Sequence, residues 1–320
     1  MGTPSVLAVV LSFNTQTDTL ECLESLKLQD CPNLSLLVID NASTDGSQQA
    51  VKARFPDIEL LPLDTNLGWA GGNNVGVRIG LERKVDLICL LNNDLVLQQT
   101  ALRLLASAYT KLGSCLLHPS IYYYSDPDLP QLDPTTTGST TGEVIRKLSA
   151  SEGEGVWELD HAYGACLMVG TEVFRRIGMF DERFFLQLEE TDFFLRAQRQ
   201  GLRALCVPSA RVLHKESVAF GGRRTPSKTY YSIRNTLLLT EKHTTFGSFK
   251  FLTYLKRRLY WQLRGVHRSN ASGNFWRWLL SADAYAVAAR RALLDYLTRR
   301  FGRINTNSAR AIEKVLAART

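Results

Sequence analysis

One segment of the sequence could hold a divalent cation. Asn92, Asn93 and Asp94 follow the apolar run of residues 86–91, directly after a predicted strand. Mg²⁺ and Mn²⁺ prefer oxygen ligands, take few of them from the protein and accept diphosphate oxygens for the rest. His214, which follows the last predicted strand, is a second candidate ligand. The same residue types are also typical of a β-turn and of a packed histidine, and the residues alone leave these interpretations open.

A cluster of carboxylates could act as a general base. Glu189, Glu190 and Asp192 crowd the start of a predicted helix. The helix macrodipole tolerates negative charge there, which is the simpler explanation of the cluster. Mutual repulsion and partial burial could instead raise one pKa toward the range that suits a general base. The cluster therefore predicts a proton acceptor, with the choice among the three residues open.

Two further segments are suited to binding a nucleoside diphosphate. Residues 40–47 (DNASTDGS) follow a predicted strand, and the carboxylate of Asp40 can accept hydrogen bonds from a nucleobase N–H or from ribose hydroxyls. Residues 66–76 (NLGWAGGNNVG) open a predicted helix, where glycines permit close backbone approach and the helix N-terminus favours anions. Each segment alone is also typical of an ordinary turn between a strand and a helix.

An alternation of apolar runs and amphipathic segments positions these residues. We predict strands at residues 5–13, 34–39, 58–63 and 86–91 and helices at residues 17–28, 47–55, 73–83 and 98–112. Short runs that are apolar throughout, alternating with helices, indicate an α/β fold with a mainly parallel sheet covered on both faces. Ligands bind such sheets at the carboxyl ends of the strands, where the polar segments lie.

The pattern changes further along the chain. Residues 122–155, rich in Pro, Gly, Ser and Thr, predict a long mobile connection of the kind that forms lids. We expect regular structure to resume at residues 163–169, followed by helices at residues 171–177 and 189–201 and a strand at residues 202–213. Beyond Gly221 and Gly222 we predict basic helices at residues 249–263 and 275–300, with a loop at residues 270–273.

Charge divides the 320-residue chain near residue 220. Residues 1–220 carry 18 Lys and Arg against 27 Asp and Glu, a net charge of −9, whereas residues 221–320 carry 20 against 4, a net charge of +16. Such asymmetry indicates an anionic partner, either a membrane surface or nucleic acid. The basic, aromatic-rich helices could lie in a membrane interface or pack as a soluble cap. Because no nucleic-acid reading motif is present and the acidic body would repel phosphate, we expect no nucleic-acid partner.

Composition and cysteine usage indicate a globular protein of a reducing compartment. The chain is 45% hydrophobic and 22% charged, which excludes a disordered or collagen-like protein. The six cysteines show no CxxC spacing, and several lie in apolar runs where Cys acts as a small hydrophobe. The N-terminus lacks the basic start of a signal peptide, and no apolar stretch reaches the ~18 residues that span a bilayer. We expect a cytoplasmic protein, or one peripheral on the inner face of the cell membrane.

In this order and spacing, the segments resemble glycosyltransferase family 2, the inverting nucleotide-sugar enzymes of GT-A fold, and within it the rhamnosyltransferase-like branch. The matching segments are VVLSFN (9–14), DNASTDGS (40–47), NLGWAGGNNVG (66–76), LLNNDLVL (90–97), YGACLMV (163–169), FDERFFLQLEETDFFLR (180–196) and His214. The resemblance implies a GT-A catalytic domain in residues 1–220, followed by a basic, helical C-terminal region in residues 221–320.

The resemblance also implies roles for individual residues. Ser12, Asn14, Asp40 and Asn41 would line the nucleoside pocket, and Asn66, Gly72 and Asn74 would lie near the base and diphosphate. Asp94, beside Asn92 and Asn93, would be the last carboxylate of a DXD motif and bind Mg²⁺ or Mn²⁺, with His214 completing the metal site. Glu190 would be the catalytic base, with Glu189 and Asp192 as alternatives. The chain departs from the family pattern in keeping one DXD carboxylate and in having Glu189-Glu190 where the family has a Glu-Asp pair.

The reaction implied is inverting transfer of a sugar, rhamnose in this branch, from a dTDP-sugar or UDP-sugar to a hydroxyl acceptor. The acceptor would be a glycan or lipid-linked oligosaccharide in bacterial surface polysaccharide synthesis. A nucleotidyltransferase acting on sugar phosphates is the alternative enzyme, since it also combines a parallel sheet with a metal-binding carboxylate. Its Gly-rich, basic phosphate loop is absent from residues 12–16 (SFNTQ), where it would follow the first strand. The sequence makes no prediction of the oligomeric state.

Overall fold

The computed structural model describes residues 2–135, 144–149, 153, 155–215, 225–244, 263–267 and 274–317. The predicted helix at residues 249–263 lies outside the described residues except for Leu263, and so do the predicted loop at residues 270–273 and the pair Gly221 and Gly222. The chain forms two compact units, one of Met1–Phe180 with Glu190–Ala219 and one of Asp181–Glu189 with Phe220–Thr320. We call them the sheet unit and the helical unit.

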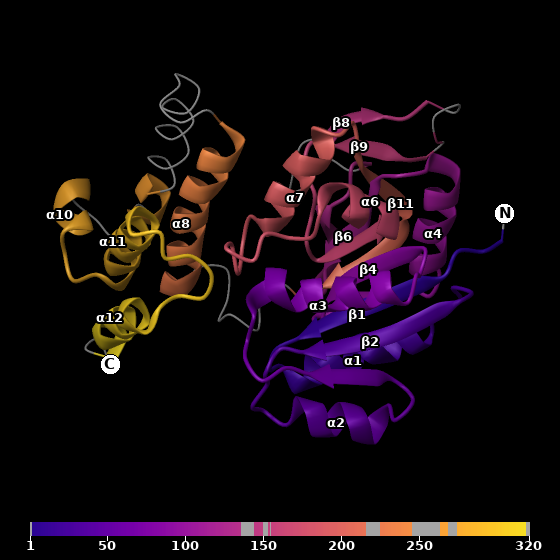
Figure 1. Cartoon of the computed structure of the whole chain (residues 1–320), viewed down its shortest axis with the longest axis horizontal. Coiled ribbons are helices and arrows are strands. Elements are labelled where there is room, and N and C mark those ends of the chain that lie inside the picture. The colour runs from indigo at the N-terminus through magenta and orange to yellow at the C-terminus, as the bar shows by residue number, and fades with distance from the viewer. Residues whose placement is uncertain are drawn as a thin grey trace. The chain divides into compact units, whose positions relative to one another are not determined.

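The sheet unit contains a single sheet with the strand order β3-β2-β1-β4-β10-β6-β11-β9-β8, in which β5 also pairs with β11 and β7 with β6 (Figure 1). The strands are β1 (Val6–Ser12), β2 (Leu34–Asp40), β3 (Glu59–Pro62), β4 (Leu87–Asn92), β5 (Leu95–Leu97), β6 (Leu116–Tyr123), β7 (Asp126–Leu132), β8 (Val144–Lys147), β9 (Trp157–Leu159), β10 (Cys166–Gly170) and β11 (Ala204–His214). Strands β3, β2, β1 and β4 run parallel, whereas β10 is antiparallel to both of its neighbours. The predicted α/β fold with a large central sheet is confirmed. The sheet is mixed rather than mainly parallel, because β5, β7, β9 and β10 pair antiparallel with their neighbours.

Helices cover both faces of this sheet. They are α1 (Gln16–Lys27), α2 (Ser47–Arg54), α3 (Gly68–Glu82), α4 (Ala101–Leu112), α6 (Thr171–Ile177) and α7 (Glu189–Gln198). Alternate side chains of a strand face opposite ways, and β1 shows what each face meets. A Cβ added at Gly76 of α3 would lie 2.4 Å from Cγ1 of Val9, whereas Oγ of Ser12 lies 3.0 Å from Oγ1 of Thr19 in α1. Every residue of β1 is therefore buried, as its apolar run predicts.

Helix α3 begins at Gly68 rather than at residue 73, so the predicted start is wrong. The sequence favours a turn over residues 68–72 because Gly is a poor helix former. In the structure, Gly72, Gly76 and Gly80 form a stripe along α3 that meets the side chains of β1 and β4. Close packing against the sheet thus outweighs the local propensity.

The prediction of a long connection at residues 122–155 is also wrong for the part that the structure describes. Strands β7, β8 and β9 lie within it, and β6 reaches into it. Strand β7 contains Pro127 and Pro130, but among the described strands it pairs with β6 alone, and with shifts in register. Proline is tolerated in such edge strands because its missing N–H is not needed for a second partner.

The helical unit contains α8 (Pro226–His243), α10 (Phe275–Leu279), α11 (Ala284–Leu297) and α12 (Thr306–Ala317), and α8 and α11 run side by side (Figure 1). The predicted single helix at residues 275–300 is wrong, because the chain breaks between α10 and α11. Asp283 accepts hydrogen bonds from the backbone N–H of Tyr285 (3.0 Å) and Ala286 (3.2 Å), and so caps a new helix. No helix among the described residues is long and apolar enough to cross a membrane.

Candidate functional site

The first part of the site lies at the carboxyl ends of β1 and β2. Ser12 and Asp40 are register partners at the ends of these parallel strands, and both are buried. Oδ1 of Asp40 accepts hydrogen bonds from the backbone N–H of Ser43 (2.9 Å) and from Gln48 (2.8 Å). Oδ2 of Asp40 is buried and has no hydrogen-bond partner within the part of the chain that the structure describes. A buried oxygen in this state indicates a place for a donor group of a ligand.

Asn14, Asn41 and Asn66 organise the loops at this edge. Asn14 has a φ of 56°, in the left-handed region that Asn tolerates better than most residues. The side chain of Asn41 donates to the carbonyl of Gly68 (3.1 Å) and accepts from the backbone N–H of Leu67 (2.8 Å), and Asn66 accepts from the N–H of Gly68 (2.8 Å). These contacts hold the start of α3 at the edge of the sheet, while direct contact of the three residues with a nucleotide remains a prediction.

Gly72 and Asn74 of α3 pack against neighbouring residues of the sheet unit. A Cβ added at Gly72 would lie 2.4 Å from Cδ1 of Leu11 and 3.3 Å from Nδ2 of Asn41. The buried side chain of Asn74 donates to the carbonyl of Phe180 (2.9 Å) and accepts from its N–H (3.0 Å). The structure gives both residues a packing role, and their proximity to a diphosphate remains a prediction.

Asp94 and His214 are brought together by the antiparallel pairing of β5 with β11. Leu95 and His214 are register partners, so Asp94, the residue before Leu95, lies beside the histidine. Both side chains are buried, and Oδ1 of Asp94 lies 3.3 Å from Nε2 of His214. This Oδ1 is buried without a hydrogen-bond partner among the described residues.

Gln131 of β7 orients His214, and sequence analysis missed it. Nδ1 of His214 lies 2.8 Å from Oε1 of Gln131, while Nε2 of Gln131 lies 3.4 Å from the carbonyl oxygen of His214. Because an amide oxygen can only accept, Nδ1 donates to Gln131, and Nε2 is the ring nitrogen directed at Asp94. Tyr163 also donates to Oε1 of Gln131, at 3.2 Å. No local signal marks Gln131, since it lies in the segment that the sequence predicts to be a connection.

The facing atoms of Asp94 and His214 suit a divalent cation. A carboxylate oxygen and an imidazole nitrogen face one another favourably when either a proton on Nε2 or a divalent cation lies between them. Among the described residues, no group of three or more His, Cys, Asp or Glu side chains is placed to hold a metal. A site with two protein ligands agrees with Mg²⁺ or Mn²⁺, which take their other oxygens from water and a diphosphate.

The amides of Asn92 and Asn93 are bonded within the fold. Oδ1 of Asn92 accepts from Nε1 of Trp69 at 2.9 Å. Nδ2 of Asn93 donates to the hydroxyls of Thr19 (2.7 Å) and Thr15 (2.8 Å) at the start of α1. The two amides thus anchor this turn to α1 and α3, and Asp94 is the carboxylate of the turn. Contact of Asn92 and Asn93 with the donor sugar nucleotide stays a prediction.

The three carboxylates at the start of α7 differ in their surroundings. Asp192 is fully buried, and its Oδ2 accepts from Nε of Arg196 at 2.9 Å. Glu189 is also buried. Glu190 is half-buried, and burial raises the pKa of its carboxyl above the ordinary value. Because a general base works best with a pKa near the operating pH, these surroundings favour Glu190 over Asp192, which is paired with Arg196.

Glu190 lies beside Trp69, which is bonded to the turn that carries Asp94. A Cβ added at Gly164 would lie 3.7 Å from Cγ of Glu190 and 3.3 Å from Cζ2 of Trp69, so this glycine lets both side chains approach. Trp69 in turn donates to Asn92, two residues before Asp94. A carboxylate suited to accept a proton and a carboxylate suited to bind a cation therefore belong to one connected part of the sheet unit.

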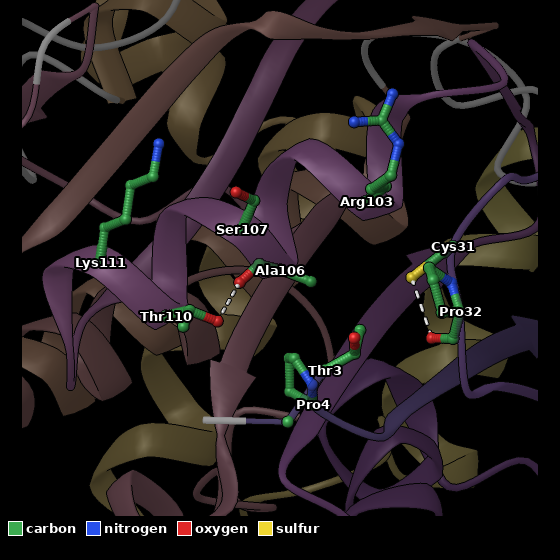
Figure 2. A pocket seen from close by; sticks show the side chains of 10 residues that line it. Thr3, Pro4, Cys31, Pro32, Arg103, Ala106, Ser107, Thr110 and Lys111 are labelled. Atoms are coloured by element: carbon green, nitrogen blue, oxygen red, sulfur yellow. Dashed lines mark hydrogen bonds between the residues drawn. The ribbon is translucent and has the colours of Figure 1, made fainter.

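A pocket of about 340 Å³ lies at the other end of the parallel strands, where β1 and β2 begin (Figure 2). Its lining includes Thr3 and Pro4, which precede β1, and Cys31 and Pro32, which precede β2. These residues mark the amino ends of the parallel strands. Since α/β sheets bind their ligands at the carboxyl ends, this pocket is not the candidate site.

Comparison with protein families identifies the family to which the chain, with its site at the carboxyl ends of the strands, belongs. The family model described as glycosyl transferase family 2 matches residues 7–178, more than half of the chain. The chain belongs to glycosyl transferase family 2. The matched region contains Ser12, Asp40, Trp69 and Asp94. Membership in the family supports glycosyl transfer from a nucleotide sugar and confirms that interpretation over a nucleotidyltransferase.

Three curated relatives are glycosyltransferases. The chain is 28% identical over 205 residues to the low-salt glycan biosynthesis hexosyltransferase Agl10 of Haloferax volcanii, a match that covers 63% of this chain and 66%, just under two thirds, of that protein. It is 26% identical to the dTDP-rhamnosyl transferase RfbF of Shigella flexneri, over 75% of this chain and 81% of that one. It is 27% identical to an N-acetylglucosaminyl-diphospho-decaprenol L-rhamnosyltransferase of Mycobacterium tuberculosis, over 76% of this chain and 84% of that one.

Solved structures of low identity share the fold. S. aureus TarS 1–349 in complex with UDP-GlcNAc superposes with a TM-score of 0.60 at 15% identity, over 91% of this chain and 81% of that one. The mannosyltransferase PcManGT from Pyrobaculum calidifontis, in complex with GDP-Man and Mn²⁺, gives a TM-score of 0.54 at 17% identity, over 99% of this chain and 87% of that one. The GT-A fold expected of the family is confirmed.

Proposed function

We propose that the chain transfers rhamnose from a dTDP-sugar to a hydroxyl of a lipid-linked glycan, by single displacement with inversion at the anomeric carbon. The observation that carries the proposal is the position of Trp69. It lies beside Glu190 at Gly164 and donates to Asn92, in the turn whose Asp94 faces His214. Two of the relatives above are rhamnosyltransferases, one named for a dTDP-sugar and one for a diphospho-decaprenol acceptor, and they support these substrate classes. UDP-sugars are the next donors to test.

The donor nucleoside would bind at the ends of β1 and β2. The unpartnered Oδ2 of Asp40 is suited to accept a hydrogen bond from a nucleobase N–H or a sugar hydroxyl. Ser12 lies across from it in register, and Asn41 and Asn66 hold the start of α3 at the same ends of the strands. We therefore propose that the nucleoside binds at Ser12 and Asp40, as the family resemblance implies.

The diphosphate would bind beside Asp94 and His214, which would hold Mg²⁺ or Mn²⁺ through Oδ1 and Nε2. When bound, such a cation supplies the positive charge that stabilises the leaving nucleoside diphosphate. Gln131 accepts from Nδ1 of His214 and so directs Nε2 at Asp94, which prepares the histidine for that role.

Glu190 would act as the base. Its carboxylate accepts the proton of the acceptor hydroxyl while the oxygen forms a bond to the anomeric carbon and the bond from that carbon to the diphosphate oxygen breaks. Assistance of this kind is typically worth about 10²–10⁴-fold in rate. Asp192 is less suited because its carboxylate is bonded to Arg196.

We assign residues 1–220 to a catalytic domain and residues 221–320 to a region that contacts the acceptor or an anionic membrane. Trp276 and Leu280 are 66% and 78% exposed, and Arg277 between them is exposed as well. Exposed apolar side chains beside a cation are typical of helices that lie in a membrane interface. A cytoplasmic enzyme, peripheral on the inner face of the membrane, would meet a lipid-linked acceptor there.

A panel of nucleotide sugars tests the proposal. Thermal unfolding of the full chain is measured with dTDP-rhamnose, UDP-sugars and GDP-mannose, each with and without Mn²⁺. We expect dTDP-rhamnose with Mn²⁺ to raise Tm most, because a ligand at 100 times its Kd stabilises the folded state by about 2.7 kcal/mol. A larger shift with another nucleotide would overturn the donor assignment, and retention of anomeric configuration in the product would overturn the mechanism.

A further inference from the structure

The chain that leads into α7 has an unusual backbone. Phe185, Gln187 and Leu188 have φ values of 64°, 70° and 70°, so three non-glycine residues in this short loop occupy the left-handed region. Side chains other than Gly adopt this region at a cost, and a loop keeps it only where the surroundings hold it. Two positions after Leu188 the chain reaches Glu190, the proposed base. We call residues 183–188 the approach loop.

Two side chains of α8 hold the approach loop. Nδ2 of Asn235 lies within hydrogen-bond distance of the carbonyl oxygens of Phe184 (2.9 Å), Leu186 (2.7 Å) and Gln187 (2.8 Å). The guanidinium of Arg234 donates to the carbonyls of Arg183 (3.1 Å) and Phe184 (3.0 Å). Both side chains are completely buried in the helical unit.

The pair is arranged so that neither side chain can turn away. Nε and Nη2 of Arg234 donate to Oδ1 of Asn235 at 3.1 and 2.9 Å, which leaves Nδ2 of Asn235 directed at the loop. Nη1 of Arg234 donates to the carbonyl of Gly302 at 2.7 Å. Phe185 of the loop stacks on Tyr231 with ring centroids 5.3 Å apart. We call Arg234 and Asn235 the clamp.

Burial of an arginine and an asparagine in a helix interface is unfavourable for packing alone. Apolar residues of similar volume often stabilise a core as well or better, so buried polar groups of this kind are retained where they specify one arrangement. What the clamp specifies is the backbone between Arg183 and Gln187, since its donors reach four carbonyls of that segment.

We propose that Arg234 and Asn235 are positioning residues for Glu190: they fix the left-handed conformation of the approach loop, and the covalent chain carries that geometry into the start of α7. The inference rests on the proposed function, in which Glu190 is the base. A displacement of about 1 Å at a reacting group can lower a rate by about 10²-fold. A change in the backbone of this loop would therefore displace Glu190 and lower kcat without changing the contacts of the bound donor.

The substitution Asn235→Asp tests the clamp. It keeps the shape and the acceptor for Arg234 but directs a carboxylate oxygen, which cannot donate, at three carbonyls. We expect kcat to fall about 10–100-fold while KM and Kd for the nucleotide sugar stay within about twofold of wild type. Hydrogen exchange in a peptide spanning residues 181–190 should become faster, and Arg234→Lys, which keeps the charge but loses the fork, should be intermediate in both measurements.

The matched control is Ser308→Ala. Ser308 is buried in the helical unit, where it donates to Asp295 and accepts from Asn305, and its hydrogen bonds within the described residues do not involve the approach loop. We expect it to lower Tm with kcat and exchange at residues 181–190 unchanged. If Asn235→Asp does not fold, Asn235→Ala below its Tm gives the same comparison. A loss of kcat no larger than in Ser308→Ala, or unchanged exchange in the loop, would overturn the clamp. Normal turnover of Glu190→Gln would instead remove the base from the proposed function, while loop exchange would still report on the clamp.

Discussion

The sheet unit and the helical unit both bury polar side chains, but they use them differently. In the sheet unit, buried oxygens of Asp40 and Asp94 have no hydrogen-bond partner among the described residues. In the helical unit, the buried donors of Arg234 and Asn235 are directed at carbonyls of the chain itself. A buried polar atom without a hydrogen-bond partner can indicate a ligand site, whereas hydrogen-bonded donors can specify a backbone. The comparison therefore rests on Asp40 and Asp94 at the ends of the strands and on the Arg234–Asn235 pair, since the helical unit also buries atoms without a described partner, such as Oδ1 of Asp295.

The largest effect is expected from Glu190→Gln. Loss of the base should lower kcat by about 10²–10⁴-fold, while Kd for the nucleotide sugar stays the same because the amide has the same shape. The control is Glu82→Gln, an exposed carboxylate in the last turn of α3, which should transfer sugar normally. Near-normal kcat for Glu190→Gln would assign the proton transfer to another group.

The pH dependence of kcat sharpens this assignment. Burial raises the pKa of Glu190 above 4.5, and a base works only when ionised, so kcat should fall as the pH drops through that raised value. We expect the acid limb of the profile to have its midpoint above pH 4.5 in wild type and to be missing in Glu190→Gln. A wild-type limb at or below the ordinary carboxyl range would argue against a buried base.

Asp192→Asn should change stability rather than catalysis. Removing one partner of the buried Asp192–Arg196 pair leaves a charge uncompensated, and such changes cost about 3–5 kcal/mol. Chemical denaturation measures this loss. Asp57→Asn, which breaks the exposed pair with Lys27, should leave the midpoint nearly unchanged. Full stability with abolished turnover would give Asp192 a part in the reaction.

Gln131→Leu should weaken cation binding by about 10–100-fold, the usual effect of losing a hydrogen bond that orients a metal-binding histidine. Mn²⁺ is titrated by electron paramagnetic resonance in the presence of dTDP. Gln29→Leu, which removes bonds to the carbonyls of Ser25 and Gln98, is the control and should bind Mn²⁺ normally. Equal affinity in the two variants would contradict the orienting role of Gln131.

The smallest effect concerns the surface. The double change Trp276→Ala with Leu280→Ala should lower binding to vesicles of anionic lipid by about tenfold, because two exposed apolar side chains no longer insert. Leu28→Ala, which removes a 66% exposed leucine of the sheet unit, should not change binding. If all variants bind equally, or if binding does not weaken with salt, the helical unit is not the membrane contact.

Local patterns predict most of the sheet unit correctly and the helical unit less well. The apolar runs at residues 5–13, 34–39 and 86–91 predict β1, β2 and β4 because parallel buried strands must be apolar throughout. The break at Asp283 and the strands near Gln131 were not predicted. The cap at Asp283 is a local signal inside a segment whose apolar period continues across it. Strand β7 depends on pairing with β6, where an edge position tolerates proline.

By itself, the sequence determined the alternation of strands and helices, the polar residues at the strand ends and the family to which the chain belongs. The tertiary structure alone decided which polar side chains meet. The pairing of β5 with β11 sets His214 against Asp94, and Gln131 reaches His214 across 83 positions of sequence. The hydrogen bonds of Arg234 and Asn235 to the carbonyl of Phe184 span 50 and 51 positions. Contacts between residues so far apart leave no periodic trace in the sequence, because periodicity reports only which face of a local element is buried.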